Sequence, residues 1–157
     1  MLSARLVQII EDHADLLTRG LIDDLLTNKH TPHYHHLTRE ELHDRSYDVY
    51  RNFGRWLGDE TESAIESSYN HLGEKRFAEG IPLSEIVYAL GLTKHHLLDY
   101  IRFSGMIDSA VDLHGAQELQ RRVGRFFDKA VYYTVRGFEH EADWQDLSTT
   151  AVRGAMG

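Results

Sequence analysis

The stretch 73–101, GEKRFAEGIPLSEIVYALGLTKHHLLDYI, says most about the fold, because it holds the end of one helix and the start of another. Gly80 can adopt the left-handed backbone conformation that caps a helix, so the helix that precedes it is predicted to end near Phe77. Ile81-Pro82 follows, and proline suits the first position of a new helix. Apolar residues then recur at helical spacing, at Leu83, Ile86, Val87, Leu90, Leu97 and Ile101. The stretch therefore predicts two amphipathic helices joined by a tight turn.

Helical periodicity continues in both directions, and no useful length of sequence alternates with the two-residue period of a strand. The predicted helices cover about 2–26, 39–57, 59–77, 83–104 and, as the longest, 108 or 115 to 143. Thr38 and Glu41 have the spacing of a capping box at the start of the second helix. We therefore expect an all-α bundle of about five helices with a long C-terminal helix. Residues 1–144 would form the domain, and 145–157 a flexible tail or linker.

Two of these helices have a clear apolar face. In the first helix, Leu6, Ile10, Leu17, Leu21 and Leu25 share the face, and Ile9 and Leu16 widen it. In the second helix, the face consists of Leu42, Val49, Phe53 and Trp56. Both faces are expected to pack into one core.

The composition limits the class of protein. A chain of 157 residues with 41% hydrophobic and 27% charged residues suits one folded domain. Its net charge of -8, with no dense basic cluster, argues against nucleic acid as a partner. The absence of cysteine excludes disulfides and thiol chemistry. No run approaches the roughly 20 apolar residues of a membrane helix, so we expect a cytoplasmic protein without a membrane partner.

The predicted last helix is apolar on two sides. Leu113, Ala116, Val123, Phe127, Ala130 and Phe138 form one stripe. Leu119, Phe126 and Tyr133 form a second stripe, with a spacing of seven residues. Two stripes suit a helix that packs on its own core and on a partner helix, although a helix buried in mid-domain has the same pattern. We favour the first interpretation, which makes Leu119, Phe126 and Tyr133 candidates for a homodimer interface.

Histidines crowd the connection after the first helix, at His30, His33, His35 and His36. Neutral imidazoles bind zinc, nickel and copper, so His33, His35 and His36 are the candidate metal ligands. A histidine tract is only compositional evidence, however. A solvated connector is the favoured interpretation, and no metal is expected.

Two further histidines lie near apolar faces: His13 between Ile10 and Leu17, and His96 beside Leu97. Either could be an axial haem ligand in a helical pocket. A hydrogen-bonded histidine in the core is the commoner arrangement, and no cofactor is expected.

Aromatic residues and mid-helix glycines suggest a ligand pocket. Glycines at Gly54, Gly91 and Gly124 each cost helix stability, which suggests a packing reason such as the close approach of a helix or ligand. The candidates for lining an apolar pocket are Trp56, Tyr69, Tyr88, His96 and Phe127. Aromatic packing in the core is the plainer alternative. No nucleophile elbow, phosphate loop or paired catalytic carboxylates stand out, so we do not expect an enzyme.

The order of segments resembles one known family. LTREELHDRSYDVYRNFGRWL at 37–57, a Glu-rich helix and then the stretch 73–101 are similar to the N-terminal sensory domains of stressosome regulators, of the RsbR/RsbRD type. The most specific part is RFAEGIPLSEIV at 76–87. The resemblance spans about 2–143 and implies a globin-like or related helical bundle, usually dimeric and often without haem. It carries over no ligand residues.

The resemblance implies a bacterial signal-transduction input domain. Such a domain would be a homodimer that relays the binding of a ligand or partner through its last helix to a downstream output domain or regulator. A haem- or metal-binding helical sensor is the alternative, and an unrecognised enzyme ranks last.

Overall fold

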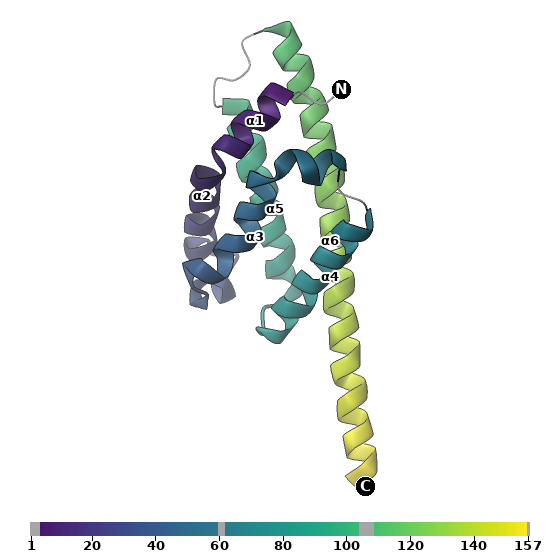
Figure 1. Cartoon of the computed structure of the whole chain (residues 1–157). Coiled ribbons are helices and arrows are strands. Elements are labelled where there is room, and N and C mark those ends of the chain that lie inside the picture. Colours follow the sequence, from purple (N-terminus) through teal and green to yellow (C-terminus); the bar gives the residue numbers. More distant parts are fainter. Residues whose placement is uncertain (1–3, 60–61, 104–108, 157) are drawn as a thin grey trace.

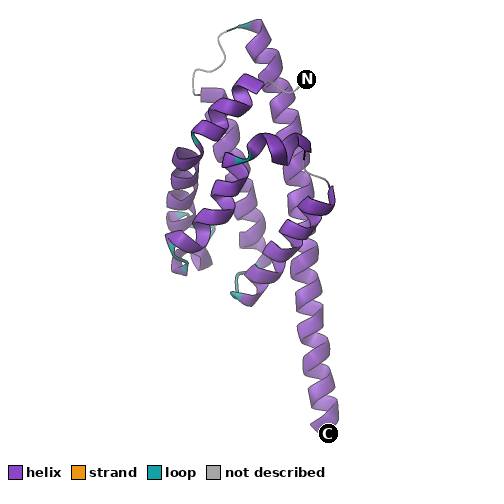
Figure 2. Ribbon diagram, in the orientation of Figure 1, coloured by secondary structure: helices purple, strands orange, loops and turns teal. Residues whose placement is uncertain are grey.

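The computed structural model describes residues 4–59, 62–103 and 109–156 of the chain (Figure 1). Within these ranges all regular structure is helical, which confirms the all-α prediction (Figure 2). The described α-helices are α1 (Ala4–Asp12), α2 (Ala14–Thr27), α3 (Arg39–Arg51), α4 (Glu62–Ala78), α5 (Leu83–Phe103) and α6 (Ala110–Met156). Two short elements complete this part of the chain: the 3-10 helix η1 (Pro32–His36) and the π-helix η2 (Arg55–Asp59).

The first predicted helix is divided in two at His13. The backbone of His13 leaves helical geometry, with ψ at 20°, and its ring Nδ1 lies 2.7 Å from the carbonyl oxygen of Ile9. The predicted face is confirmed, since Leu6, Ile10, Leu17, Leu21 and Leu25 are all buried. Leu16 is exposed, so the expected widening of the face on that side is wrong. The break at His13 therefore separates α1 from α2 while both keep a buried face.

The capping box at Thr38 is confirmed: its hydroxyl accepts the N–H of Glu41, whose carboxylate accepts the N–H of Thr38. The helix that follows ends at Arg51, earlier than predicted, and the chain continues into η2. The π-turn still buries Trp56, whose indole N–H donates to Asp48 at 2.9 Å.

The turn predicted at Gly80 is also confirmed. Gly80 has a φ of 76°, the left-handed value that glycine tolerates best. Its N–H donates to Phe77 at 3.0 Å, and the N–H of Ile81 donates to Arg76 at 3.1 Å, as in a Schellman cap. After Pro82, α5 begins with a buried face, although the predicted member Val87 is largely exposed.

The last helix, α6, is longer than predicted. It has 47 residues, so at 1.5 Å per residue it extends about 70 Å, well beyond the other helices (Figure 1). The predicted helix end at Asp143 is therefore wrong, because the segment expected to be a flexible tail is helical to Met156. Side chains from Asp143 to Thr150 are all exposed. We refer to residues 143–156 as the extension of α6.

Helices α4 and α6 cross with almost no space between their backbones. A Cβ atom at Gly73 would lie 2.0 Å from the carbonyl oxygen of Thr134, and one at Gly137 would lie 2.1 Å from that of Asn70. Only glycine fits both positions, so the two glycines allow the close crossing. Gly91 and Gly124, by contrast, have open space where a Cβ would be, so close packing does not explain them.

The core lies between α1, α2, α3, α4, α5 and the first half of α6. It includes three of the eight tyrosines, Tyr34, Tyr50 and Tyr69, together with Phe126 and Phe127. None of the described helices is long and apolar enough to cross a membrane. A globin-like arrangement stays a prediction.

Candidate functional site

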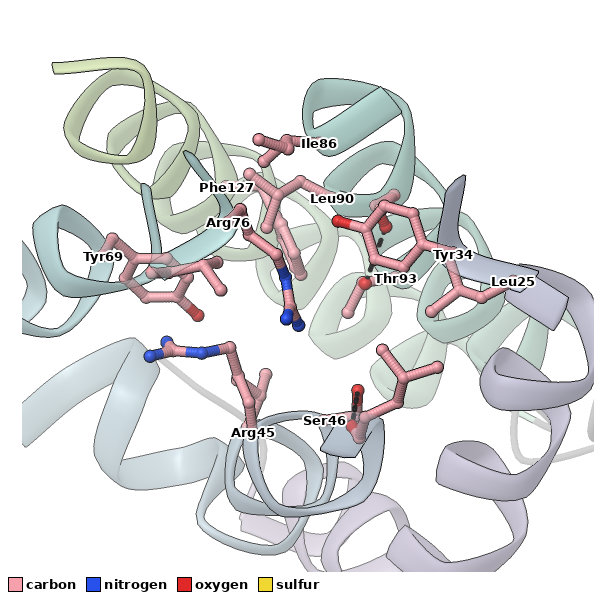
Figure 3. Close-up of a pocket in the computed structure, with 14 residues that line it drawn as sticks. Leu25, Tyr34, Arg45, Ser46, Tyr69, Arg76, Ile86, Leu90, Thr93 and Phe127 are labelled. Atoms are coloured by element: carbon pink, nitrogen blue, oxygen red, sulfur yellow. Dashed lines mark hydrogen bonds between the residues drawn. The ribbon is translucent and has the colours of Figure 1, made fainter. Parts of the chain in front are cut away.

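A cavity of about 50 Å³ lies at the centre of the bundle (Figure 3). Its wall is made by residues of α2, η1, α3, α4, α5 and α6: Leu25, Tyr34, Leu42, Arg45, Ser46, Val49, Tyr69, Leu72, Arg76, Ile86, Ala89, Leu90, Thr93 and Phe127. Most of these side chains are apolar, as is usual in a ligand pocket. These six elements thus contribute to one small space.

Arg76 is the most unusual residue of this wall. It comes from the last turn of α4, is 5% exposed, and directs its guanidinium group toward the middle of the cavity (Figure 3). Its Nη1 donates to both carboxylate oxygens of Glu79, at 3.1 and 2.8 Å, and the group lies 5.5 Å from the centre of the Tyr34 ring. Its Nε has no hydrogen-bond partner among the described residues. A buried charged group with an unused donor is costly, which makes Arg76 a candidate for ligand binding.

A second arginine, Arg45 of α3, lies on the opposite side of the cavity. Its guanidinium donates to the hydroxyl and the carbonyl oxygen of Ser68, both at 3.2 Å, and lies 5.4 Å from the centre of the Tyr69 ring. Burial lowers the pKa of Arg45, and the nearby charge of Arg76 lowers it further. No carboxylate within the described ranges forms an ion pair with Arg45, although the charge of nearby Asp48 raises the pKa of this arginine.

The tyrosine hydroxyls of the wall are neutral at ordinary pH. Burial raises the pKa of Tyr34 to about 12, although the charge of Arg76 opposes the change. Burial also raises the pKa of Tyr69 and of the adjoining Tyr50. These phenols can donate or accept a hydrogen bond but do not balance the arginines.

The smaller hydroxyls are already used by the protein. Ser46 donates to the carbonyl oxygen of Leu42 at 3.2 Å, and Thr93 donates to that of Ala89 at 2.9 Å. Tyr50 donates to the carbonyl oxygen of Thr93 at 3.0 Å. Within the described part of the wall, the buried donor left without a partner is the Nε–H of Arg76.

Of the five residues predicted to line a pocket, Tyr69 and Phe127 line this cavity. Trp56 packs against Tyr69, with ring centres 6.1 Å apart, but does not reach the space. Tyr88 is 39% exposed and contacts the ring of His30 on the outside. His96 pairs with Asp24 at 2.9 Å, away from the cavity.

Sequence reasoning missed Arg45, Arg76 and Tyr34. The arginines occur in charge-rich helices, where a solvated side chain is the usual expectation, and Tyr34 lies among the histidines of η1. A signal was present for Arg76, because it is within the segment 76–87 that was identified as the most specific part of the sequence.

The candidate dimer residues need a correction. Leu119 and Phe126 are buried within the single chain, and Tyr133 is partly buried with its hydroxyl 2.7 Å from Glu62. The stripe therefore packs on the chain's own core, because α4 and η2 cover this side of α6. The interpretation of these three residues as an open interface is not supported by their burial.

The same heptad pattern becomes exposed farther along α6. Steps of seven residues lead from Tyr133 to Leu147, and from Ala130 through Gly137 to Trp144. Trp144 is 60% exposed and Leu147 is 65% exposed, both on the extension where no other described element reaches. We call Trp144 and Leu147 the exposed seam.

The candidate metal ligands do not converge. His33 pairs with Glu85, whose other oxygen accepts the backbone N–H of His33, and His35 Nε2 lies 2.9 Å from the carbonyl oxygen of Asn28. His36 is exposed. Within the described ranges, no three His, Asp or Glu side chains are grouped as metal ligands. His13, one of the two candidate haem ligands, is exposed and lies against Tyr100, outside the cavity.

Comparisons with protein-family models, with curated proteins and with solved structures found no match to this chain. The resemblance to stressosome sensory domains therefore stays a prediction from the sequence.

Proposed function

We propose that this chain is a signal-transduction input domain, which binds a small ligand in its central cavity and relays binding through α6 in a homodimer. The observation that carries the proposal is Phe127. This residue belongs to the wall of the cavity and also to the helix that leaves the bundle. A ligand in the cavity would thus contact α6, the described helix that extends beyond the bundle (Figure 1).

Aromatic packing connects the cavity to the heptad stripe. Phe127 lies edge-on to Phe126, with ring centres 5.2 Å apart, and Phe126 packs on Tyr69 at 5.8 Å and Trp56 at 5.9 Å. Tyr69 is itself part of the cavity wall. A shift of Phe127 or Tyr69 should therefore also displace Phe126, because close-packed cores do not deform freely. A ligand shifts α6 only if it binds two arrangements with different affinity.

The exposed seam supports dimerisation through a second copy of the chain. Trp144 and Leu147 lie in register with the buried stripe, three residues apart on one face of the extension. The extension, residues 143–156, is short enough that an isolated helix of its length would be only marginally stable in water. A partner helix packed on the extension would stabilise it. A coiled coil between two extensions buries both residues as neighbouring core positions.

The test is to place a charge on the seam. We expect Trp144→Glu and Leu147→Glu each to weaken the dimer by at least about 30-fold, as for an aromatic or aliphatic residue at the centre of an interface. Analytical ultracentrifugation over a range of concentrations measures the change. Circular dichroism should show that the bundle stays folded, because neither residue contributes to the core.

Thr149→Glu is the matched control, since it adds the same charge to an exposed position of the extension two residues from the seam. The control should dimerise like the unaltered chain. A chain that is monomeric at every concentration, or seam variants that dimerise as well as Thr149→Glu, would contradict the proposal.

A further inference from the structure

We propose that the central cavity is a site for a small carboxylate of about four non-hydrogen atoms, with Arg76 and Arg45 as the groups that recognise it. The inference rests on the proposed function, because it names the chemical class of the ligand for the same cavity.

The first step is the unused hydrogen-bonding capacity of Arg76. Its side chain is almost wholly buried, its guanidinium points into the cavity, and its Nε–H lacks an acceptor among the described residues. Guanidinium groups bind carboxylates through paired N–H donors, a geometry that an ammonium group does not offer. A ligand oxygen in the cavity would satisfy the donor that the protein leaves free.

The second step is charge. Glu79 forms an ion pair with Arg76, whereas the partners of Arg45, Ser68 and Tyr69, are uncharged. Asp48 is close enough for its charge to raise the pKa of Arg45, but its carboxylate accepts hydrogen bonds from the indole of Trp56 and the amide of Asn52 and forms no ion pair with Arg45. Glu85 pairs with His33. A ligand carboxylate would therefore give Arg45 the ion pair that it lacks among the described residues.

The third step is size and shape. A water molecule needs about 10–15 Å³ of such space, so the cavity of about 50 Å³ holds about four non-hydrogen atoms. The remaining wall is apolar, with Leu25, Val49, Leu90 and Phe127, which suits a short hydrocarbon tail. Phosphate and sulfate need donors on all sides, whereas the unpartnered donor in the described wall is the Nε–H of Arg76. An acid such as acetate fits both parts of the wall.

The experiment is titration calorimetry of the full chain with sodium acetate, at constant ionic strength, with acetamide as a neutral ligand of equal size. We expect a Kd for acetate between about 0.1 and 10 mM, within the limit for so small a ligand, and binding of acetamide at least about tenfold weaker. Acetate should also raise the melting temperature of the chain.

Variants identify the site. Arg45→Gln and Arg76→Gln should each weaken acetate binding at least about tenfold, because a hydrogen bond to a charged group is lost. Arg121→Gln, which alters an exposed arginine outside the cavity, should bind acetate normally. If a glutamine variant fails to fold, Ala89→Leu decides the matter, since it fills the cavity without removing a charge and should abolish binding.

Equal binding of acetate and acetamide, no acetate binding at all, or full binding by Ala89→Leu would each overturn the carboxylate site. These results differ from those that test the relay. Arginine-dependent acetate binding that leaves dimer affinity unchanged supports the site and contradicts the relay. Absence of acetate binding in a chain whose seam variants are monomeric contradicts the site alone.

Discussion

Single buried polar residues give the centre of this bundle its chemistry. Arg76 lies with its guanidinium inside a mostly apolar wall, and Tyr34 and Tyr69 lie with their hydroxyls nearby (Figure 3). Such residues are seldom buried without a partner, because removal of a charged or polar group from water is costly. Glu79 pairs with Arg76, but the Nε–H of Arg76 is left without a partner among the described residues, and the proposed binding site rests on this donor.

The buried phenols predict a loss of stability at alkaline pH. In the unfolded chain a tyrosine ionises near pH 10, whereas burial raises the pKa of Tyr34 to about 12 in the folded chain. The contribution of Tyr34 is fully present below pH 10 and is lost between about pH 10 and 12, because the unfolded state alone releases its proton there. Urea unfolding should show a free energy that falls steeply over this interval.

Tyr34→Phe provides the control for that measurement. The variant lacks the ionising group, so its stability should fall less steeply with pH between 10 and 12. An identical slope for the variant and the unaltered chain would show that Tyr34 ionises equally in both states.

At the scale of helices, the distance between α4 and α6 depends on single glycine residues at their crossing. The crossing of α4 and α6 brings the backbones together at Gly73 and Gly137, where a methyl group would overlap a carbonyl oxygen. Because the obstructing atoms belong to the backbone, they cannot rotate away, and the helices would have to separate. This crossing also anchors α6 just before the extension begins.

The same substitution should therefore have opposite effects at two glycines. We expect Gly73→Ala to lower the free energy of unfolding by about 3 kcal/mol, because it forces the helices apart. Gly124→Ala, in open space on α6, should raise it by up to about 1 kcal/mol, since alanine favours a helix more than glycine does. Chemical denaturation of both variants measures the difference. A Gly73→Ala variant as stable as Gly124→Ala would refute the close crossing.

At the scale of the whole molecule, the cavity and the exposed seam are joined by one continuous helix. Coupling between two sites is reciprocal. If a ligand in the cavity changes the affinity of the dimer, dimerisation must change the affinity for the ligand by the same factor. We expect Ala89→Leu, which fills the cavity, to change the dimer Kd by about fivefold or more, within the usual range of such coupling.

Analytical ultracentrifugation measures the dimer Kd of the variant. Ser84→Leu is the control, because it adds the same side chain to an exposed position of α5. The control should leave the dimer Kd unchanged. If Ala89→Leu and Ser84→Leu behave alike, packing in the cavity has no influence on the extension.

Some features of this protein were determined by sequence alone, because each depends on a few neighbouring residues. The turn at Gly80, the capping box at Thr38 and the buried face of α2 are local, and the structure confirms all three. The end of α6 was missed, since Asp143 marks only the point where the other helices stop covering it, while the helix itself continues.

Tertiary structure alone decided which apolar and polar side chains meet. The heptad stripe through Leu119 and Phe126 has the same spacing whether α4 or a second chain covers it, so sequence could not distinguish core from interface. Likewise, Arg45 and Arg76 are 31 positions apart and share a cavity only because α3 and α4 pack around it. Periodicity reports the face of a helix that is apolar, whereas burial depends on the neighbours that the whole fold supplies.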